Sequence, residues 1–493
     1  MIFIYLLSGL FLGWSLGAND TGNIFGAAVE TRMLKFKKAA LIASIFITLG
    51  ALLEGSGPSG TLGRLGSVDA LGGAFTVALA AAITITVIVR LGIPVSTSQT
   101  IVGAIIGWNF FSGRLTDYGS LITIASSWVL AFVLSAAIAA LLFYTVKPWV
   151  NRSKRHLLEQ DLIIRYALIV VGAFGAYSLG ANNIANVVGV FVPVSPFKDI
   201  SVGNLFTITG LQQLYLMGAL SIVVGIYTYS HKVMRTVGKD LFHLSPITAL
   251  VALLAEALVL FLFASRGLYN LLLSLHLPTI PLVPVSSTQV IVGAVVGIGL
   301  AKGGKNIRYN ILARISLAWV AAPLIAFLIS YTALFIIQNV FEQKVQQETN
   351  YIFDRMVITK IDREGFSTGA LSTVNGRSFK TERAIHQELQ AGPPLSRNEL
   401  MQIISIAEIH EMTVDVKRLL DSGLHKGFSA AEIDVLRSLQ DRSYRHKWQL
   451  RDALGKYPEF KLFPAPESER QKNHNRILTG KFDILYRTFT KLK

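Results

Sequence analysis

Two polar motifs each occur twice in this chain, and both copies interrupt apolar sequence. Residues 94–107 read PVSTSQTIVGAIIG and residues 284–297 read PVSSTQVIVGAVVG. Residues 17–23 read GANDTGN, and residues 180–186 read GANNIAN. We expect a broken helix at each motif. In lipid, a broken helix is tolerated only where its freed backbone groups line an enclosed cavity, and paired breaks in two halves mark a transporter's binding site.

The composition is that of a membrane protein. Hydrophobic residues make up 52% of the 493 residues and charged residues only 15%, whereas about 25% charged is usual in soluble domains. Apolar stretches such as residues 71–89, 120–146 and 309–337 are long enough to cross or enter a bilayer. The chain has no cysteine, which excludes disulfides, thiolate metal sites and cysteine nucleophiles.

Charge divides the chain into a membrane part and a tail. Residues 1–340 carry 21 Lys and Arg against 10 Asp and Glu, whereas residues 341–493 carry 25 against 20. We expect membrane repeats at 1–156 and 157–340, and a soluble accessory domain at 341–493. The basic excess of the membrane part fits the positive-inside rule. It predicts no basic patch on a soluble face, so nucleic acid is not an expected partner.

Basic clusters also indicate the orientation of the halves. They lie at residues 32–38, 147–155, 232–239 and 302–308. If all four clusters face the cytoplasm, the chain must cross the membrane an even number of times between one cluster and the next. Between the first two clusters, this number is even only if residues 71–111 form a re-entrant hairpin that does not cross. The second hairpin then enters from the opposite face. The predicted fold is an all-α polytopic membrane protein with two inverted-topology repeats, broken helices and two re-entrant helical hairpins, plus a small soluble C-terminal domain.

The tail carries its own local signals. Ser396–Glu399 and Ser429–Glu432 fit capping boxes, and Asn375-Gly376 is a hairpin-turn signal. These patterns favour a small α+β or mainly helical domain.

The GAND motif is a candidate cation site. A carboxylate near the bilayer centre costs about 2.5–3.5 kcal/mol, so Asp20 is a functional candidate by default. Hard cations such as sodium prefer carboxylate, amide and carbonyl oxygens, which Asp20, Asn19 and Asn23 supply. The alternative is that Asp20 only caps a half-helix beginning near Gly22. The second copy has Asn183 in place of Asp20, so the two half-sites differ by one negative charge.

The two PVS motifs are candidate anion-binding tips. Each has a proline followed by hydroxyl side chains at the start of an apolar helix. Helix N-termini offer free N–H donors and about half a positive charge each, which suits a tetrahedral oxyanion without a buried Lys or Arg. Ordinary N-capping is the alternative. The partial positive charges of two helix N-termini would not balance the two negative charges of a divalent oxyanion. This imbalance suggests symport with a cation.

Together these strings resemble the inorganic phosphate transporter (PiT) family over roughly residues 1–340. The resemblance implies phosphate carriers coupled to sodium or protons, with an inverted-repeat fold, and it leaves a homodimer open. The implied phosphate-binding residues are Ser96, Thr97, Ser98, Gln99, Ser286, Ser287, Thr288, Gln289, Asp20 and Asn183. The implied ligands of the coupling cation are Asn19, Asp20, Asn23, Asn182, Asn183 and Asn186.

The sequence departs from the family pattern at three of these positions. The family usually has Asp where Asn183 stands, which puts the number of coupled cations in doubt. Many relatives have His where Gln99 and Gln289 stand. Nothing in the resemblance transfers to the tail.

The predicted function is import of inorganic phosphate across the cell (inner) membrane by symport with a cation, with sodium favoured over a proton. A sulfate permease of the same fold is the alternative. An anion channel, or a membrane sensor for the tail, is a further alternative. The sequence shows no P-loop, metal triad or nucleophile–base set, so neither an enzyme nor a cofactor is predicted.

Overall fold

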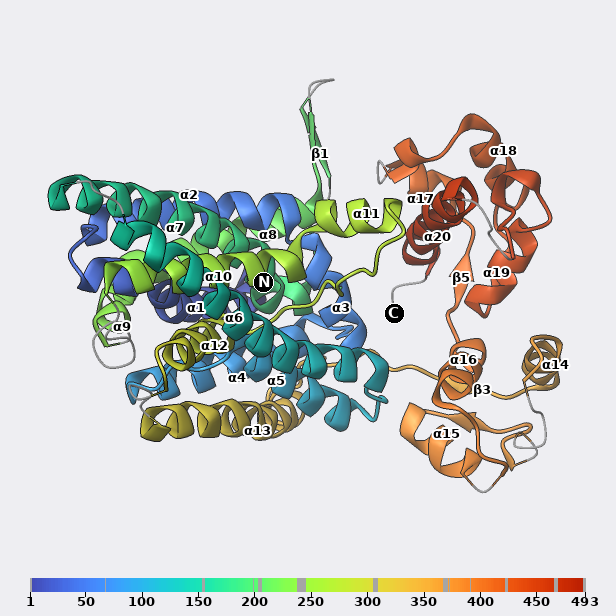
Figure 1. Ribbon diagram of the computed structural model, residues 1–493. Coiled ribbons are helices and arrows are strands. Elements are labelled where there is room, and N and C mark those ends of the chain that lie inside the picture. Colours follow the sequence, from blue (N-terminus) through green and yellow to red (C-terminus); the bar gives the residue numbers. More distant parts are fainter. Residues whose placement is uncertain are drawn as a thin grey trace. The chain divides into compact units, whose positions relative to one another are not determined.

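The computed structural model of the chain is mainly helical (Figure 1). It describes residues 2–66, 68–152, 156–197, 199–202, 206–236, 245–304, 309–366, 371, 373–390, 392–421, 424–464 and 469–490. Parts of the basic clusters, at residues 153–155, 237–239 and 305–308, lie outside these ranges. The chain forms two compact units, Met1–Gln347 and Glu348–Lys493.

The first unit consists of two runs of helices. The first run contains α1 (Ile2–Glu30), α2 (Phe36–Glu54), α3 (Ser56–Leu65), α4 (Leu71–Arg90), α5 (Thr97–Ser112) and α6 (Tyr118–Arg152). The second contains α7 (Leu157–Val188), η1 (Gly189–Phe191), α8 (Gly210–Gly225), η2 (Ile226–Ser230), α9 (His231–Thr236), α10 (Pro246–Ala264), α11 (Arg266–Ser274), α12 (Ser287–Ala301) and α13 (Tyr309–Asn339). A short antiparallel pair, β1 (Ile200–Val202) and β2 (Phe206–Ile208), precedes α8.

Seven helices in the described part of the chain are long and apolar enough to cross a bilayer. They are α2, α4, α6, the stretch Leu158–Phe191, the stretch Gly210–Met234, α10 and α13. This number and the predominance of helix confirm the prediction of an all-α polytopic membrane protein.

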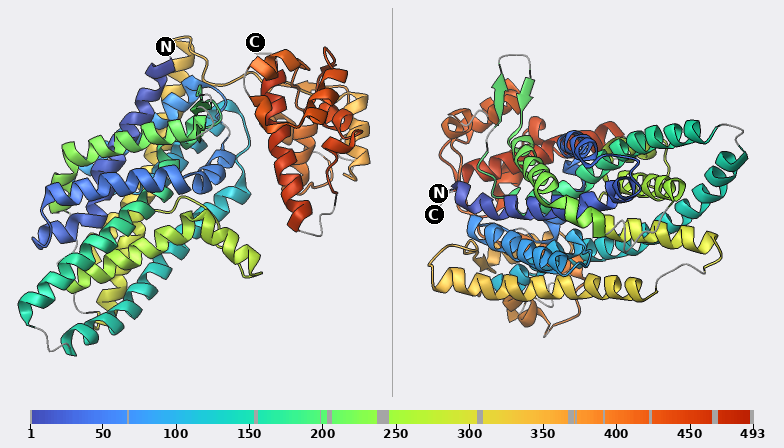
Figure 2. Two further views of the ribbon diagram at one scale, coloured as in Figure 1. Left: turned by 90° about the horizontal axis from the view of Figure 1, so that it is seen from above. Right: turned by 90° about the vertical axis from the view of Figure 1, so that its left-hand side faces the viewer.

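Contacts between the two runs come in matching pairs. Helix α1 packs on α8 as α2 packs on α7, and α5 packs on α13 as α12 packs on α6 (Figure 2). Glycines allow the close crossings. Gly17 of α1 lies against the backbone of Ile222 in α8, and Gly180 of α7 lies against that of Ile47 in α2. The duplicated sequence therefore produces duplicated packing.

The prediction of broken helices at the GAN motifs is wrong. Helix α1 runs without interruption through Gly17–Asn23, and α7 runs through Gly180–Asn186. The polar side chains of these turns find partners on neighbouring segments, and the glycines permit close helix crossings rather than unwinding. Asp20 therefore lies within a helix and does not cap one.

Each PVS motif joins two helices. Residues 91–96 connect α4 to α5, and Ser96 is the N-cap of α5. In the second half, α10 is followed by the exposed helix α11 before the chain reaches Ser286, the N-cap of α12. Residues 266–281 have no counterpart between α4 and α5, and they form α11 and the connection that follows it.

The last residues of the first unit follow the helices. The indole N–H of Trp108 donates to the carbonyl oxygen of Val345 at 3.0 Å, and the backbone N–H of Gln347 donates to Asp69 at 2.9 Å. These contacts explain why the first unit extends to Gln347, beyond the expected boundary at residue 341.

The second unit is mainly helical with two small sheets. Its elements are β3 (Tyr351–Ile352), α14 (Arg355–Arg363), β4 (Ser378–Phe379), α15 (Glu382–Leu389), α16 (Arg397–Ala407), β5 (Met412–Thr413), α17 (Val416–Asp421), η5 (Leu424–Gly427), α18 (Ala430–Ser438), β6 (Ser443–Tyr444), α19 (Lys447–Leu454), η6 (Pro458–Phe460) and α20 (Glu469–Phe489). Both predicted capping boxes are confirmed, at the starts of α16 and α18.

The tail is also built from two similar parts. Tyr351 of β3 pairs with Phe379 of β4, as Met412 of β5 pairs with Tyr444 of β6. Each second strand belongs to an Arg-Ser-aromatic triplet and follows a residue with positive φ, Gly376 in one part and Asp441 in the other. The predicted turn at Asn375-Gly376 exists, but β4 pairs with the distant β3, so the prediction of a tight hairpin there is wrong.

A buried histidine predicts pH-dependent stability of the tail. His446 is fully buried and its Nδ1 lies 2.8 Å from the carbonyl oxygen of Glu408. Burial lowers the pKa of His446 below its usual value of 6.5, so protonation favours the unfolded state. The stability is complete above about pH 6.5 and declines as the pH falls below it.

We therefore expect amide exchange in α16 and α19, corrected for its intrinsic pH dependence, to speed up as the pH is lowered from about 7.5 to about 5.5. The measurement uses the full-length protein, and His446→Asn should weaken the effect. Equal corrected protection at both pH values would contradict this expectation.

Candidate functional site

The two PVS segments contact each other. The hydroxyl of Ser98, in the first turn of α5, donates to the carbonyl oxygen of Val285 at 3.0 Å. The hydroxyl of Thr288, in the first turn of α12, donates to the carbonyl oxygen of Val95 at 3.0 Å. Segments about 190 residues apart thus form one reciprocal pair. These residues occupy equivalent positions in the two PVS motifs.

The GAN motifs connect to both tips. On α1, Asn19 donates to the carbonyl oxygen of Val95 at 2.9 Å, and Asn23 lies 3.4 Å from the hydroxyls of Ser287 and Thr288. On α7, each equivalent asparagine contacts the opposite PVS segment. Asn182 donates to Val283 at 3.2 Å, and Asn186 donates to the hydroxyl of Ser98 at 2.8 Å.

Asp20 and Asn183 meet where the two motifs face each other. The amide of Asn183 donates to Asp20 Oδ2 at 3.0 Å, and the amide of Asn19 donates to Asp20 Oδ1 at 2.7 Å. Because the second copy has Asn183 where the first has Asp20, a single carboxylate lies between two amide groups, those of Asn19 and Asn183. An Asp at both positions would place two carboxylates in direct contact, which is unfavourable in a low-dielectric site.

Helix starts supply additional donors. The side chains of Ser96 and Ser286 accept from the backbone N–H groups of Gln99 and Gln289, each at 3.2 Å. The first two N–H groups of α5 and of α12 have no partner within their own helix. Because the tips touch, both helix N-termini point their partial positive charge toward one place.

The site is closed and contains unpaired oxygens. Each of its residues is exposed by 8% or less. Buried oxygens without a hydrogen-bond partner in the described structure are Thr97 Oγ1, Gln99 Oε1, Asn182 Oδ1, Asn186 Oδ1 and Gln289 Oε1. Native proteins rarely leave such groups unpaired. A cluster of oxygen acceptors next to Asp20 is what a hard monovalent cation or a bound water molecule would satisfy.

The structure brings every predicted site residue into this one region, although the sequence analysis missed Glu256. This residue is 0% exposed in α10, a helix that packs on α1. The signal was available, because Glu256 is the only charged residue in a 19-residue apolar helix.

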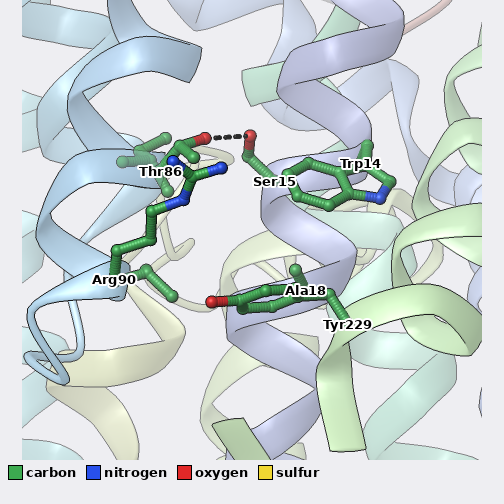
Figure 3. Close-up of a pocket in the computed structure, with 8 residues that line it drawn as sticks. Trp14, Ser15, Ala18, Thr86, Arg90 and Tyr229 are labelled. Atoms are coloured by element: carbon green, nitrogen blue, oxygen red, sulfur yellow. Dashed lines mark hydrogen bonds between the residues drawn. The ribbon is translucent and has the colours of Figure 1, made fainter. Parts of the chain in front are cut away.

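A pocket lies beside α1, close to the site along the chain (Figure 3). Its lining residues are Trp14, Ser15, Ala18, Ile85, Thr86, Val89, Arg90 and Tyr229. The hydroxyls of Ser15 and Thr86 are 3.0 Å apart across it. Ala18 directly precedes Asn19 in α1, so this pocket reaches the helix segment that carries the GAND motif.

Comparison with known proteins agrees with these features. The model of the phosphate transporter family matches residues 16–330 and also residues 267–407. A candidate phosphate permease of Methanocaldococcus jannaschii is 30% identical over 326 residues, which are 66% of this chain and 94% of the permease. Another, from Haemophilus influenzae, is 26% identical over 407 residues, with 65% of this chain and 92% of the relative covered.

A solved structure has the same fold. It is a sodium-dependent phosphate transporter that is 23% identical, with a TM-score of 0.56, and the match covers 68% of this chain and 98% of that structure. The extent of the family match confirms the resemblance that the repeated motifs indicated. The chain is an integral multi-pass membrane protein and belongs to the phosphate transporter family.

Proposed function

We propose that this protein imports inorganic phosphate by symport with a cation, sodium in preference to a proton. Phosphate would bind between the two hairpin tips and the GAN segments of α1 and α7. The observation that carries the proposal is the reciprocal pair of hydrogen bonds between the tips, from Ser98 to Val285 and from Thr288 to Val95. It joins two helix N-termini and two sets of hydroxyls into one buried site.

The donor set suits hydrogen phosphate. Helix N–H groups and the hydroxyls of Thr97 and Ser287 can donate to its oxygens. Hydrogen phosphate also carries one O–H group, which needs an acceptor, whereas sulfate has only acceptors. The Asp20 carboxylate supplies such an acceptor beside the tips, which favours phosphate over sulfate.

Charge balance supports coupling to a cation. A divalent phosphate and Asp20 bring negative charge into a site whose fixed positive charge comes from two helix N-termini. The buried residues of the described chain include no Lys or Arg. A cation held by Asp20 and the asparagine oxygens would balance the charge, and the sodium dependence named for the structural neighbour supports sodium.

The paired packing supports a transport cycle by inverted repeats. In this proposal each hairpin enters the bilayer from a different face and the tips meet near the midplane. The closed site resembles an occluded state, from which movement of one tip away from the other would open one side.

Uptake into proteoliposomes tests the proposal. We expect an inward sodium gradient to drive saturable accumulation of radiolabelled phosphate, and excess unlabelled phosphate to compete more strongly than sulfate. Stronger competition by sulfate would overturn the choice of substrate. Uptake driven only by a proton gradient would overturn the choice of sodium, and non-saturating flux without coupling would indicate a channel.

A further inference from the structure

Two lysines from different helices converge on one aromatic ring. The ammonium nitrogen of Lys147, near the end of α6, lies 4.9 Å from the ring centre of Phe143. That of Lys302, the residue after α12, lies 5.5 Å from the same ring centre. Phe143 is buried, whereas both lysine side chains reach the surface. Contacts between an ammonium group and an aromatic ring are favourable, so this ring holds two positive charges close together.

The ends of α6 and α12 are fixed to each other at this level. Lys302 is the C-cap of α12, and the chain then turns away through two glycines with positive φ. The hydroxyl of Tyr144, which follows Phe143 in α6, donates to the carbonyl oxygen of Ala301 at 3.2 Å. The two lysines therefore project from a single packed surface.

The two positive charges have no acidic partner. Neither lysine forms an ion pair with an Asp or Glu of the described residues. The C-terminus of α12 supplies only about half a negative charge. Partial burial lowers the pKa of Lys302 below its usual value of 10.5, and the charge of Lys147 lowers it further. A bound anion would relieve the repulsion between the two ammonium groups.

Exposed apolar side chains adjoin these charges. Leu141 and Tyr144 of α6 and Leu300 of α12 are each at least 60% exposed. In a membrane protein such side chains face acyl chains, and tyrosine is typical of the headgroup level. Positive charge at the end of an apolar surface matches a lipid, whose phosphate lies above its acyl chains. Free phosphate would gain nothing from the apolar part.

The other half of the membrane unit lacks this pair of charges. Helix α5 packs on α13 as α12 packs on α6, so each position has a counterpart. Counted from the two PVS motifs, Ser112 corresponds to Lys302. Counted from the Trp-Val pair that α6 and α13 share, Gln338 corresponds to Lys147. The repeated packing therefore does not require lysine at either position.

We propose that Lys147 and Lys302 bind the headgroup of an anionic phospholipid at the ends of α6 and α12. The lipid phosphate would contact both ammonium groups, and its acyl chains would follow Leu141 and Leu300. The two lysines belong to basic clusters that face the cytoplasm in the predicted topology. Basic pockets between membrane helices on that side are suited to anionic lipid headgroups. This site is separate from the one between the tips, so it does not depend on the proposed function.

Lipid binding to the purified full-length protein tests the proposal. Native mass spectrometry would compare wild type with the double variant Lys147→Gln, Lys302→Gln. The control, Lys37→Gln with Lys38→Gln, removes two exposed charges from another basic cluster. We expect the first variant to bind phosphatidylglycerol about 20-fold more weakly than wild type, and the control to bind it like wild type. No loss in the first variant, or an equal loss in both, would overturn the proposal.

Three further comparisons keep the test decisive. Lys147→Arg with Lys302→Arg keeps both charges, so it should retain binding; a loss as large as that of the glutamine variant would contradict recognition by charge. Wild type should prefer phosphatidylglycerol to phosphatidylcholine, and equal binding of the two would overturn the choice of an anionic lipid. Inorganic phosphate should not displace phosphatidylglycerol. Displacement at equal concentration would show a site for free phosphate instead of a lipid.

Discussion

Replacing Asp20 with Asn should lower sodium-driven phosphate uptake by about 100-fold or more. Asp20 is 1% exposed and accepts from the amides of Asn19 and Asn183. Substitution removes the charge and places a third amide in the same contact. Breaking a buried charge interaction costs about 3–5 kcal/mol, and 1.4 kcal/mol corresponds to a tenfold change in an equilibrium constant. Initial rates in proteoliposomes measure the loss.

A swapped variant separates charge from folding. The double substitution Asp20→Asn with Asn183→Asp moves the carboxylate to the equivalent position of the second motif. Because the surrounding contacts are reciprocal, we expect it to recover part of the uptake that the single variant loses. Full sodium-dependent uptake by Asp20→Asn alone would remove Asp20 from the cation site.

Replacing Gly103 with Val should destabilise the whole membrane unit. A Cβ atom at Gly103 of α5 would overlap the backbone of Pro323 in α13. Backbone atoms cannot rotate away, so the two helices would have to separate. Overpacking typically costs 1–3 kcal/mol, and we expect about 3 kcal/mol or more here. The measurement is the monodisperse fraction and the thermal midpoint in detergent.

Gly297→Val and Gly60→Val complete this series. Gly297 of α12 lies against the backbone of Ala136 in α6 in the same way, so it should be as sensitive as Gly103. Gly60 of α3 has open space around its Cβ position, so its substitution should be tolerated. A Gly103→Val protein as stable as Gly60→Val would show that the α5–α13 crossing is looser than described.

Much of the membrane unit could be predicted from the repeated strings. Proline followed by Ser and Thr before an apolar run specifies a helix stop and a new N-cap, and Ser96 and Ser286 have this role. Repetition of the whole string then predicted that the two tips act together. The candidate residues of the PVS tips and of the GAND motif follow from this local chemistry, whereas Asn182, Asn183 and Asn186 are implied by the family resemblance. The structure brings all of them into one region.

The remaining features depend on tertiary contacts. The GAN segments looked like helix breaks because they are polar and rich in glycine. They stay helical because Asn19 and Asn186 bond to the tips, partners that are distant in sequence. The duplicated tail was missed because its two parts share little more than an Arg-Ser-aromatic triplet, and their likeness appears in strand register.

Cross-linking of the two tips tests the central claim most directly. The chain has no cysteine, so Val95→Cys with Thr288→Cys introduces one unique thiol pair where the tips touch. We predict rapid disulfide formation in native membranes under mild oxidation, slowed by phosphate with sodium but not by either control salt, choline chloride or potassium chloride. No cross-link, with both thiols freely labelled by a membrane-impermeant reagent at the two aqueous surfaces, would contradict a shared buried site.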